Sequence, residues 1–291
     1  MERKVLVTGA SGLIGRELCK QLHDEGYYVA AVDNHFRYSH ISTCDEFSKD
    51  EVVNYTATVK NDYDYVFHMG NINGTKYFYD MPNELIERNI SADFAVFNFV
   101  KQNPNCKLIY ASSSEIVAGS TEFPTTEETD VCIENIHNPR WSYRLGKLVG
   151  ENYLMNSDLD FVIVRFFNAF GPASGTGHFV KDIIDKLKND DYSLIGADET
   201  RSFCRVEDSV DAVMNIFKIA SREVINIGSN EELTVLEAAE IIAKHMNIHA
   251  IWDLKQGNAG SVKRRKPDLT RLLKYYPSFN PRKFEDAVKD L

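Results

Sequence analysis

Short hydrophobic runs recur along this chain, separated by longer segments in which apolar residues follow helical spacing. The runs cover residues 4–7, 28–32, 63–69, 107–111, 161–167 and 223–227. Continuous apolar runs of this length are typical of strands buried on both faces of a parallel sheet. Helical spacing is clearest at 13–25, 84–102, 142–155, 179–188 and 235–246.

The alternation of strand-like and helix-like segments predicts an α/β fold, a Rossmann-type doubly wound parallel sheet with a smaller mixed α/β lobe toward the C-terminus. Glycine and proline become frequent at 171–177, so we expect the chain to leave the sheet there. The expected domains are 1–170, to which 200–230 returns, and a lobe formed by 171–291 and interleaved with the first domain.

Three glycines, Gly9, Gly12 and Gly15, follow the first hydrophobic run with regular spacing. The first permits a tight turn, the second lets the backbone approach a pyrophosphate, and the third lets the next helix pack close to the strand. The helix N-terminus would face the pyrophosphate with its amides and its dipole. This segment therefore predicts a dinucleotide site in the first domain. Its other expected contacts are Ser11, Leu13 and Ile14.

Asp33 ends the second hydrophobic run and is followed by Asn34. An acidic side chain at this position accepts hydrogen bonds from the adenosine ribose and repels a 2′-phosphate. We therefore expect the cofactor to be NAD rather than NADP. Arg37 lies nearby and slightly weakens that preference.

Tyr143 and Lys147 are four residues apart in the helical segment 142–155, so they share one face of a helix. An ammonium group and a cationic nicotinamide both favour a phenolate and lower the pKa of tyrosine. The pair is therefore predicted to move a proton while a nicotinamide moves a hydride. A third hydroxyl is expected from the serine run Ser112–Ser114, which ends the strand at 107–111.

The chain has 291 residues and a formal net charge of -10, which argues against nucleic acid as a partner. No apolar stretch is long enough to cross a bilayer, so no membrane partner is expected. The five cysteines are scattered and the histidines lack ligand spacing, so neither a disulfide framework nor a metal site is indicated. Reduced thiols in a cytoplasmic protein fit best.

With these motifs the chain resembles the extended short-chain dehydrogenase/reductase family, in its NAD-dependent nucleotide-sugar epimerase/dehydratase branch. The resemblance covers nearly the whole chain and includes Met69 and Gly70 after the third strand, and Asn89 in the following helix. It implies that these three residues contact the cofactor. Here Asn71 stands at the end of a segment that commonly reads His-x-Ala-Ala.

Later segments of the chain extend the same resemblance. Asn168 lies in an Arg-x-Phe-Asn-x-x-Gly-Pro-like segment and Arg201 in an Arg-x-Phe-x-x-Val-x-Asp-like one. Arg264 and Arg265 precede a Pro-Asp pair like that of a late family motif. The resemblance implies that these four residues hold the diphosphate of a nucleotide-sugar, a task that suits the guanidinium fork.

The implied chemistry is oxidation of the sugar at C4 by NAD, which gives a 4-keto sugar. Hydride return from the other face completes a 4-epimerisation, and we place this reaction first by a narrow margin. Dehydration, or decarboxylation of a UDP-glucuronic acid-type substrate, through the same intermediate is the alternative. A non-catalytic NAD-binding regulatory protein is a second alternative, which the intact Tyr143 and Lys147 pair disfavours.

The serine run can be aligned in two ways. Alignment on Gly119, as in epimerases, makes Ser114 the hydroxyl that shares the proton. Alignment on Glu115, as in the Ser-Thr-Ser-Glu motif of some dehydratases and decarboxylases, makes it Ser113. Glu115 is then either a base at C5 or a solvated loop residue. The Pro139-Arg140-Trp141 sequence resembles bacterial UDP-glucuronic acid decarboxylases.

Relatives in this branch usually dimerise through a four-helix bundle, so the resemblance implies a homodimer built from segments 84–102 and 142–155. An apolar stripe of Phe94, Phe97 and Val100 is the candidate contact surface, and core packing explains it equally well.

Overall fold

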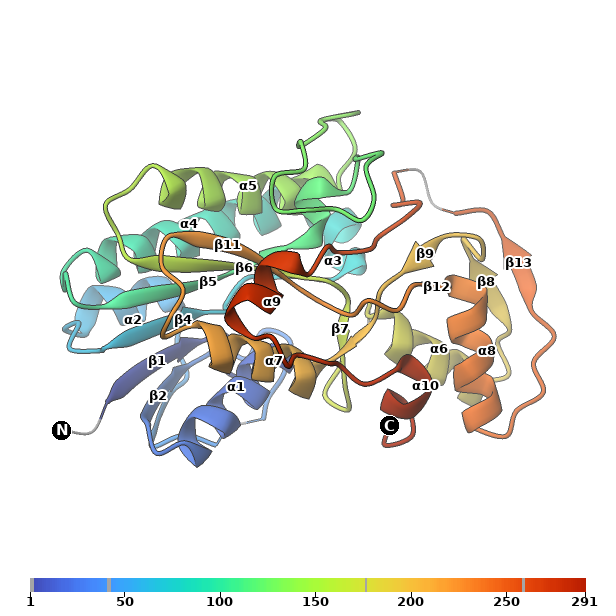
Figure 1. The fold of residues 1–291 in the computed structure, drawn as a ribbon, viewed down its shortest axis with the longest axis horizontal. Helices are drawn as coiled ribbons and strands as arrows, with labels where there is room; N and C mark the ends of the chain where they lie inside the picture. The colour runs from blue at the N-terminus through green and yellow to red at the C-terminus, as the bar shows by residue number, and fades with distance from the viewer. Residues whose placement is uncertain (1–2, 41–42, 176, 258–259) are drawn as a thin grey trace.

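The computed structural model describes residues 3–40, 43–175, 177–257 and 260–291. Its centre is a seven-stranded sheet in the order β11-β6-β5-β4-β1-β2-β3, in which all neighbouring strands are parallel (Figure 1). The strands are β1 (Lys4–Thr8), β2 (Tyr28–Val32), β3 (Glu46–Ser48), β4 (Tyr65–His68), β5 (Lys107–Ser113), β6 (Phe161–Phe166) and β11 (Glu223–Ile227). The predicted doubly wound α/β fold is confirmed.

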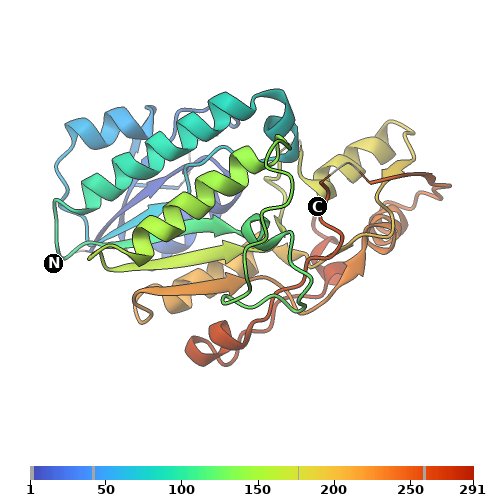
Figure 2. The same cartoon turned by 90° about the horizontal axis from the view of Figure 1, so that it is seen from above.

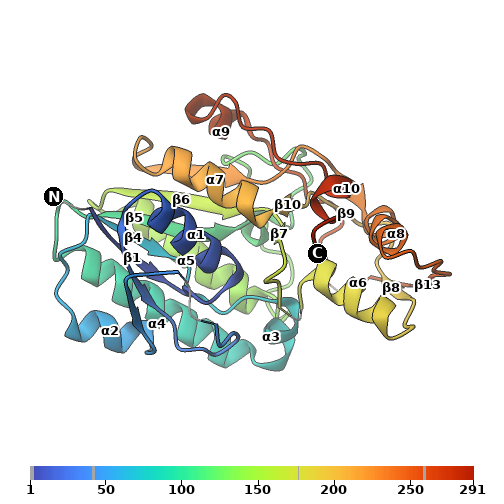
Figure 3. The ribbon, with the colours of Figure 1, turned by 90° about the horizontal axis from the view of Figure 1, so that it is seen from below.

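Helices cover both faces of this sheet. One face carries α1 (Leu13–Asp24), α7 (Val206–Ile216) and α9 (Thr270–Tyr275), and the other carries α2 (Val52–Thr58), α4 (Pro82–Val100) and α5 (Trp141–Met155) (Figures 2 and 3). Two apolar clusters fill the space between the layers. Leu18 and Val213 belong to the first and Val96 and Leu154 to the second. Burial of these faces is the main force that holds the layers together.

The C-terminal lobe has its own apolar core between α6 (Phe179–Lys188), α8 (Val235–His245) and the short α10 (Phe284–Ala287). Its strands pair two by two: β8 (Ser193–Ile195) with β13 (Asp253–Lys255), and β9 (Thr200–Arg201) with β12 (Leu233–Thr234). A third pair, β7 (Ala169–Phe170) with β10 (Cys204–Arg205), lies where the chain passes between the two parts (Figure 1).

The chain crosses between the two parts more than once. Helix α7 packs on α1, and β11 pairs with β6, so 206–227 lies with the large sheet. Helix α9 packs on α7 and β11 and brings residues 270–275 to the same face. The return of α9 has no motif of its own in the sequence, because this helix is only six residues long.

Candidate active site

A cavity of about 510 Å³ lies at the carboxyl ends of β1, β2, β4, β5 and β6, and the C-terminal lobe closes its other side. In an open parallel sheet this edge is where ligands bind, because the loops after the strands converge there. Nearly all the sequence-predicted site residues line it: Gly9, Gly12, Leu13, Ile14, Gly15, Asp33, Asn34, Met69, Gly70, Asn89, Ser113, Ser114, Glu115, Tyr143, Lys147, Asn168, Arg201 and Arg265. Ser11 and Arg264 are not among the lining residues.

The turn after β1 has the close backbone approaches that its glycines permit. Gly9 has φ 65°, and a Cβ there would lie 2.6 Å from the Cα of Gly70. A Cβ on Gly15 would lie 2.1 Å from the carbonyl oxygen of Gly9. Helix α1 begins at Leu13, and no side chain caps its N-terminus. The cradle and the first-turn amides fit a pyrophosphate.

Asp33, at the end of β2, is held by two backbone amides. Ser11 donates its N–H to one carboxylate oxygen at 3.0 Å, and His35 donates to the other at 2.7 Å. Ser11 therefore holds Asp33 in place through its backbone N–H without lining the cavity itself. Each carboxylate oxygen keeps acceptor capacity for ribose hydroxyls.

Asn89 lines the cavity but uses its amide to hold the loop after β4. It donates to the carbonyl of Ile72 at 3.0 Å and accepts from the N–H of Ile72 at 2.8 Å. Met69 and Gly70 begin this loop, and Met69 donates its N–H to the carbonyl of Thr8. Asn89 therefore shapes the cofactor side of the cavity through the backbone.

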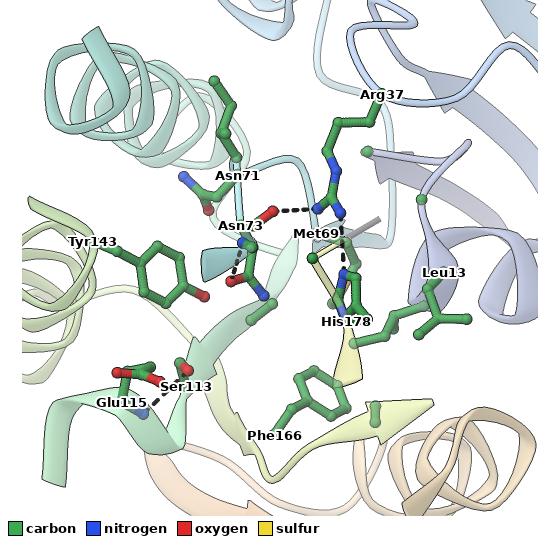
Figure 4. Close-up of a pocket in the computed structure, with 18 of the residues that line it drawn as sticks. Leu13, Arg37, Met69, Asn71, Asn73, Ser113, Glu115, Tyr143, Phe166 and His178 are labelled. Atoms are coloured by element: carbon green, nitrogen blue, oxygen red, sulfur yellow. Dashed lines mark hydrogen bonds between the residues drawn. The ribbon is translucent and has the colours of Figure 1, made fainter. Parts of the chain in front are cut away.

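Tyr143 projects from α5 toward the end of β5, where Ser113 lies (Figure 4). Phe78 of α3 (Thr75–Asp80) stacks against the phenol ring, with the ring centroids 4.9 Å apart. Burial raises the pKa of Tyr143, and the nearby Ser113 hydroxyl opposes this only in part. The lowered pKa expected from Lys147 is therefore not found in the protein alone, because the charges of Glu115 and Asp93 act in the same direction as burial.

Lys147 lies one helical turn beyond Tyr143 and is buried. Its ammonium donates to the Oδ1 of Asn71 at 2.5 Å and to the carbonyl of Ala111 at 2.6 Å. Burial lowers the pKa of Lys147 to about 8, although Asp93 and Glu151 act in the opposite direction. The ammonium thus has one further N–H for a ligand.

Glu115 follows in a short 3-10 helix, Ser114–Val117, and is buried rather than solvated. Arg140 binds it with two hydrogen bonds, of 2.9 and 2.5 Å. Arg144 donates at 3.1 Å and Arg265 at 2.6 Å. Burial alone would raise the pKa of Glu115, but the charges of Arg265 and Arg140, with Arg144, hold it well below its usual range. A carboxylate held in this way is a weak base.

Of the four residues expected to hold a diphosphate, three line the cavity and Arg264 does not. Asn168 accepts from Arg265 at 3.2 Å and lines the cavity with it. Burial, with the charge of Arg265, lowers the pKa of Arg201 to about 10. Arg264 instead points outward, binds Glu232 at 2.7 and 2.9 Å and lies over the ring of Phe123. Arg264 and Arg265 thus face opposite sides, as adjacent residues in an extended segment do, and the expected contact of Arg264 with a ligand stays a prediction.

Arg37 joins the two lobes across the cavity. It donates to the carbonyl of Asn73 and, at 3.0 Å, to the Nε2 of His178, the residue before α6 (Figure 4). Burial and the charge of Arg37 lower the pKa of His178 to about 4, so the ring is neutral and accepts this bond. Arg37 is thus engaged in an interlobe contact.

Sequence reasoning gave no role to Arg144 or Phe78 and noted Arg140 only as context. Arg140, Arg144 and Lys147 are three or four residues apart, so they occupy one face of α5. That spacing is a signal for a charged cavity wall. Phe78 carried no signal, because α3 is a six-residue helix after a loop.

The described residues offer neither a metal site nor a membrane-spanning helix. No group of three or more His, Cys, Asp and Glu side chains within them is arranged to hold a metal. No helix in this part of the chain has the length and apolar character needed to span a membrane.

Known proteins resemble this chain over its full length. UDP-N-acetyl-alpha-D-glucosaminuronate decarboxylase of Bacillus cytotoxicus is 29% identical over 320 residues, which cover 100% of this chain and 97% of the relative. UDP-glucuronic acid decarboxylase 1 of Xenopus tropicalis is 24% identical over 282 residues, which cover 92% of this chain and 66% of the relative.

Solved structures show the same fold. UDP-glucose 4-epimerase of Thermotoga maritima, solved with UDP-glucose, has a TM-score of 0.88 at 21% identity and covers 99% of this chain, with 96% of its own length matched. UDP-glucuronic acid 4-epimerase of Bacillus cereus, solved with UDP-glucuronic acid and NAD, has a TM-score of 0.87 at 22% identity and covers 99% of this chain, with 97% of its own length matched.

The sequence pattern of one family matches residues 5–228, which is most of the chain. The family resemblance inferred from the motifs is confirmed, and with it an enzyme that uses NAD. The glycine cradle and Asp33 fit that cofactor. A non-catalytic protein is not favoured. The chain belongs to the NAD-dependent epimerase/dehydratase family.

Proposed function

We propose that this enzyme decarboxylates a nucleotide-linked uronic acid through a 4-keto intermediate. One observation carries the proposal: Tyr143 points toward Ser113, and Glu115, two residues further on, is buried among three arginines at the cavity wall. The two sequence alignments differed on this point. The position of Ser113 opposite Tyr143 supports the alignment typical of dehydratases and decarboxylases, so we place decarboxylation before epimerisation.

The charges around Glu115 favour an anionic substrate group. One carboxylate faces the guanidinium groups of Arg140, Arg144 and Arg265, which leaves an excess of positive charge. The Nε of Arg265 is buried and has no hydrogen-bond partner among the described residues. Buried donors of this kind are costly unless a ligand satisfies them. The carboxylate of a uronic acid is a suitable ligand.

The same charges separate decarboxylation from dehydration. Dehydration needs a base to take the proton from C5, and Glu115, with its strongly lowered pKa, is poorly suited to that task. Decarboxylation of a 4-keto uronic acid needs no base, because the C5–C6 bond breaks, CO₂ leaves and its electron pair passes to the C4 carbonyl as an enolate. A proton then adds at C5.

In the proposed reaction, residues of the chain transfer the O4 proton and stabilise the charge that develops on the substrate. Bound NAD supplies the hydride acceptor and later the hydride donor for C4, and its positive charge favours the Tyr143 phenolate. Tyr143 takes the O4 proton and later returns it, while Ser113 shares that proton. The phenol then donates a hydrogen bond to the enolate oxygen after CO₂ has left.

Binding of the remainder of the substrate follows from position. We assign the diphosphate to Asn168 and Arg201, which line the cavity beyond Arg265. NAD lies on Gly9–Gly15 and Asp33 in this proposal. A homodimer remains a proposal as well, although Phe97 and Val100 of the expected contact stripe belong to the core under α4. Sedimentation or light scattering would measure the oligomeric state.

The 4-epimerisation of a nucleotide-sugar is the second candidate. It is favoured by the full-length likeness to epimerase structures and by Ser114, which lines the cavity beside Ser113. It needs the same Tyr143, Lys147 and NAD, but the excess of buried arginines would have no anionic partner in the 4-epimerisation of a neutral sugar.

Mass spectrometry of the products tests the proposal. The NAD-loaded enzyme is incubated with UDP-glucuronic acid, with UDP-N-acetylglucosaminuronic acid and, as a neutral control, with UDP-glucose. Loss of one CO₂ from a uronic acid, with UDP-glucose unchanged, is the expected result. A product of unchanged mass and altered retention would establish epimerisation instead.

A further inference from the structure

A buried carboxylate, Asp93 of α4, lies behind Lys147 and is joined to it through Asn71. The amide nitrogen of Asn71 donates to the Oδ1 of Asp93 at 2.9 Å and to the carbonyl of Asn89 at 3.3 Å. Since both bonds use the NH₂ group, the amide oxygen must face the other way. It accepts from Lys147 at 2.5 Å.

Asp93 also accepts hydrogen bonds from two further neutral groups. The Nε2 of His68 donates to its Oδ1 at 2.9 Å, and the hydroxyl of Tyr110 donates to its Oδ2 at 2.8 Å. On the other side of the ring, the Nδ1 of His68 meets the hydroxyl of Thr8 at 2.6 Å. A carboxylate accepts only, so His68 carries its proton on Nε2 and Thr8 donates to Nδ1. Each polar group in this chain of bonds therefore has a defined direction.

The arrangement depends on the side chain of Asn71, because an alanine at this position could neither accept from Lys147 nor donate to Asp93. Ala111 supplies only a backbone carbonyl to the ammonium, which any residue at that place could supply. Asn71, which lines the cavity beside Lys147, thus links Asp93 to the ammonium group.

We propose that Asp93, acting through Asn71, is the positioning residue for Lys147: it fixes the direction of the ammonium group and keeps it charged beside Tyr143. The proposal concerns the catalytic pair and therefore rests on the NAD-dependent function, but not on which sugar is the substrate. Neither residue touches the reacting atoms in this assignment.

The electrostatics agree with the geometry. Lys147 is faced by Asp93 from α4, by Glu151 and Tyr143 from its own helix, by Tyr110 from β5, whose ring centroid is 4.5 Å from the ammonium, and by His68 from β4 through Asp93. Burial lowers the pKa of His68, which is therefore neutral. Burial alone would raise the pKa of Asp93, but Lys147 and the bonds from His68 and Tyr110 lower it. Asp93 and Glu151 are thus the two negative charges that support the ammonium.

Titration of Lys147 tests the proposal without any substrate. The NAD-loaded enzyme is labelled with [¹³Cε]lysine, and the signal of Lys147 is assigned by its absence in Lys147→Met. Asp93→Asn is expected to lower the titration midpoint by about one pH unit or more, because an opposite charge is lost. Asn71→Ala keeps that charge and is expected to move the midpoint less.

Kinetics then separate positioning from charge. With UDP-glucuronic acid, or whichever nucleotide-sugar is turned over, Asn71→Ala is expected to lower kcat about tenfold with little change in KM, because a misdirected ammonium slows the chemical step. The effects of Asn71→Ala and Asp93→Asn on kcat are expected to be less than additive. In the pH profile, the alkaline limb of Asp93→Asn moves to lower pH.

Tyr110→Phe is the matched control for a merely structural role. It removes one bond to Asp93 but keeps the ring under Lys147, so stability falls while the Lys147 midpoint stays in place. An unchanged Lys147 midpoint in Asp93→Asn, or fully additive effects on kcat, would overturn the proposal. If Asp93→Asn does not fold, wild-type kcat in Asn71→Ala is sufficient to overturn it. Failure of every sugar to react leaves the titration unaffected and counts against the proposed function alone.

Discussion

Two buried carboxylates lie on either side of Tyr143, and their surroundings differ. Glu115 is bound by Arg140, Arg144 and Arg265, which are all charged. Asp93 is bound by the neutral groups of His68, Tyr110 and Asn71, and its positive neighbour is reached only through an amide. Both carboxylates act to raise the pKa of the phenol between them.

The difference shows how the same charge serves two purposes. The negative charge of Glu115 is exceeded by its neighbours, so its surroundings remain positive and can take an anion. The charge of Asp93 exceeds that of its direct neighbours, so its surroundings support a cation. The effect of a buried charge on its surroundings therefore depends on how many opposite charges lie next to it.

Replacement of the phenol between the two carboxylates should have the largest effect. Tyr143→Phe is expected to lower turnover about 10³-fold, because the group that moves the O4 proton is lost. NAD content and both carboxylate clusters should be unchanged. Turnover by product analysis and NAD release on denaturation are the measurements, with Tyr275→Phe on α9 as the control. Turnover within tenfold of wild type would remove Tyr143 from the reaction.

Neutralising Glu115 and neutralising Asp93 should lower the free energy of unfolding by different amounts. Glu115→Gln leaves three buried guanidinium groups without their counter-charge, and we expect a loss of about 3 kcal/mol in the free energy of unfolding. Asp93→Asn disturbs neutral partners, and we expect about half of that. Urea unfolding at pH 7 measures both. Equal losses would show that the comparison of their surroundings is mistaken.

Arg265 and Arg264 provide a matched pair for the anion site. Arg265→Lys keeps the charge but loses the planar fork, so kcat/KM for UDP-glucuronic acid should fall about tenfold relative to wild type. Arg264→Lys, which faces outward, should change it less than about twofold. The ratio of kcat/KM values is the measurement. Similar effects of the two substitutions would show that Glu115 and its arginines do not contact the substrate.

The smallest expected effect is on the pH dependence of stability. The groups around Asp93 and those around Glu115 should lose stability at different pH values. His68 is buried neutral with a lowered pKa, so the unfolded chain binds its proton first and stability declines as the pH falls below 6.5, by at most about 1.4 kcal/mol per pH unit. The pKa of Glu115 is also lowered, so its stabilisation is complete above 4.5 and is lost only below that value. Unfolding measured from pH 8 to 4 checks this. A His68→Gln variant should lose the first slope and keep the second.

The sequence was sufficient for the cofactor side of the site. Gly9 and Gly15 permit close backbone approaches, and Asp33 places its carboxylate at the end of β2; these features follow from residue type and spacing after continuous apolar runs. Their neighbours in space are also close in sequence or lie at the ends of adjacent strands. The fold and this half of the cavity could therefore be predicted.

The sugar side could not be predicted in the same way. Its character depends on pairing between Glu115 and arginines from α5 and from the segment near residue 265. Whether Glu115 was solvated or buried, and which of Arg264 and Arg265 faced inward, depended on tertiary contacts. Asp93 was missed because a polar residue in a helix has no motif, and its role is visible only with His68, Tyr110 and Asn71 around it.

The contact between Glu115 and Arg265 has a consequence for synthesis of the chain. The two residues are 150 positions apart, so the carboxylate leaves the ribosome long before Arg265 is made. Domains generally form from the N-terminus during translation. The cofactor side can therefore assemble early, whereas the sugar side is completed only when the last part of the chain arrives. A protein that stops short of residue 265 would retain the dinucleotide cradle and lack Arg265, one of the three arginines around Glu115.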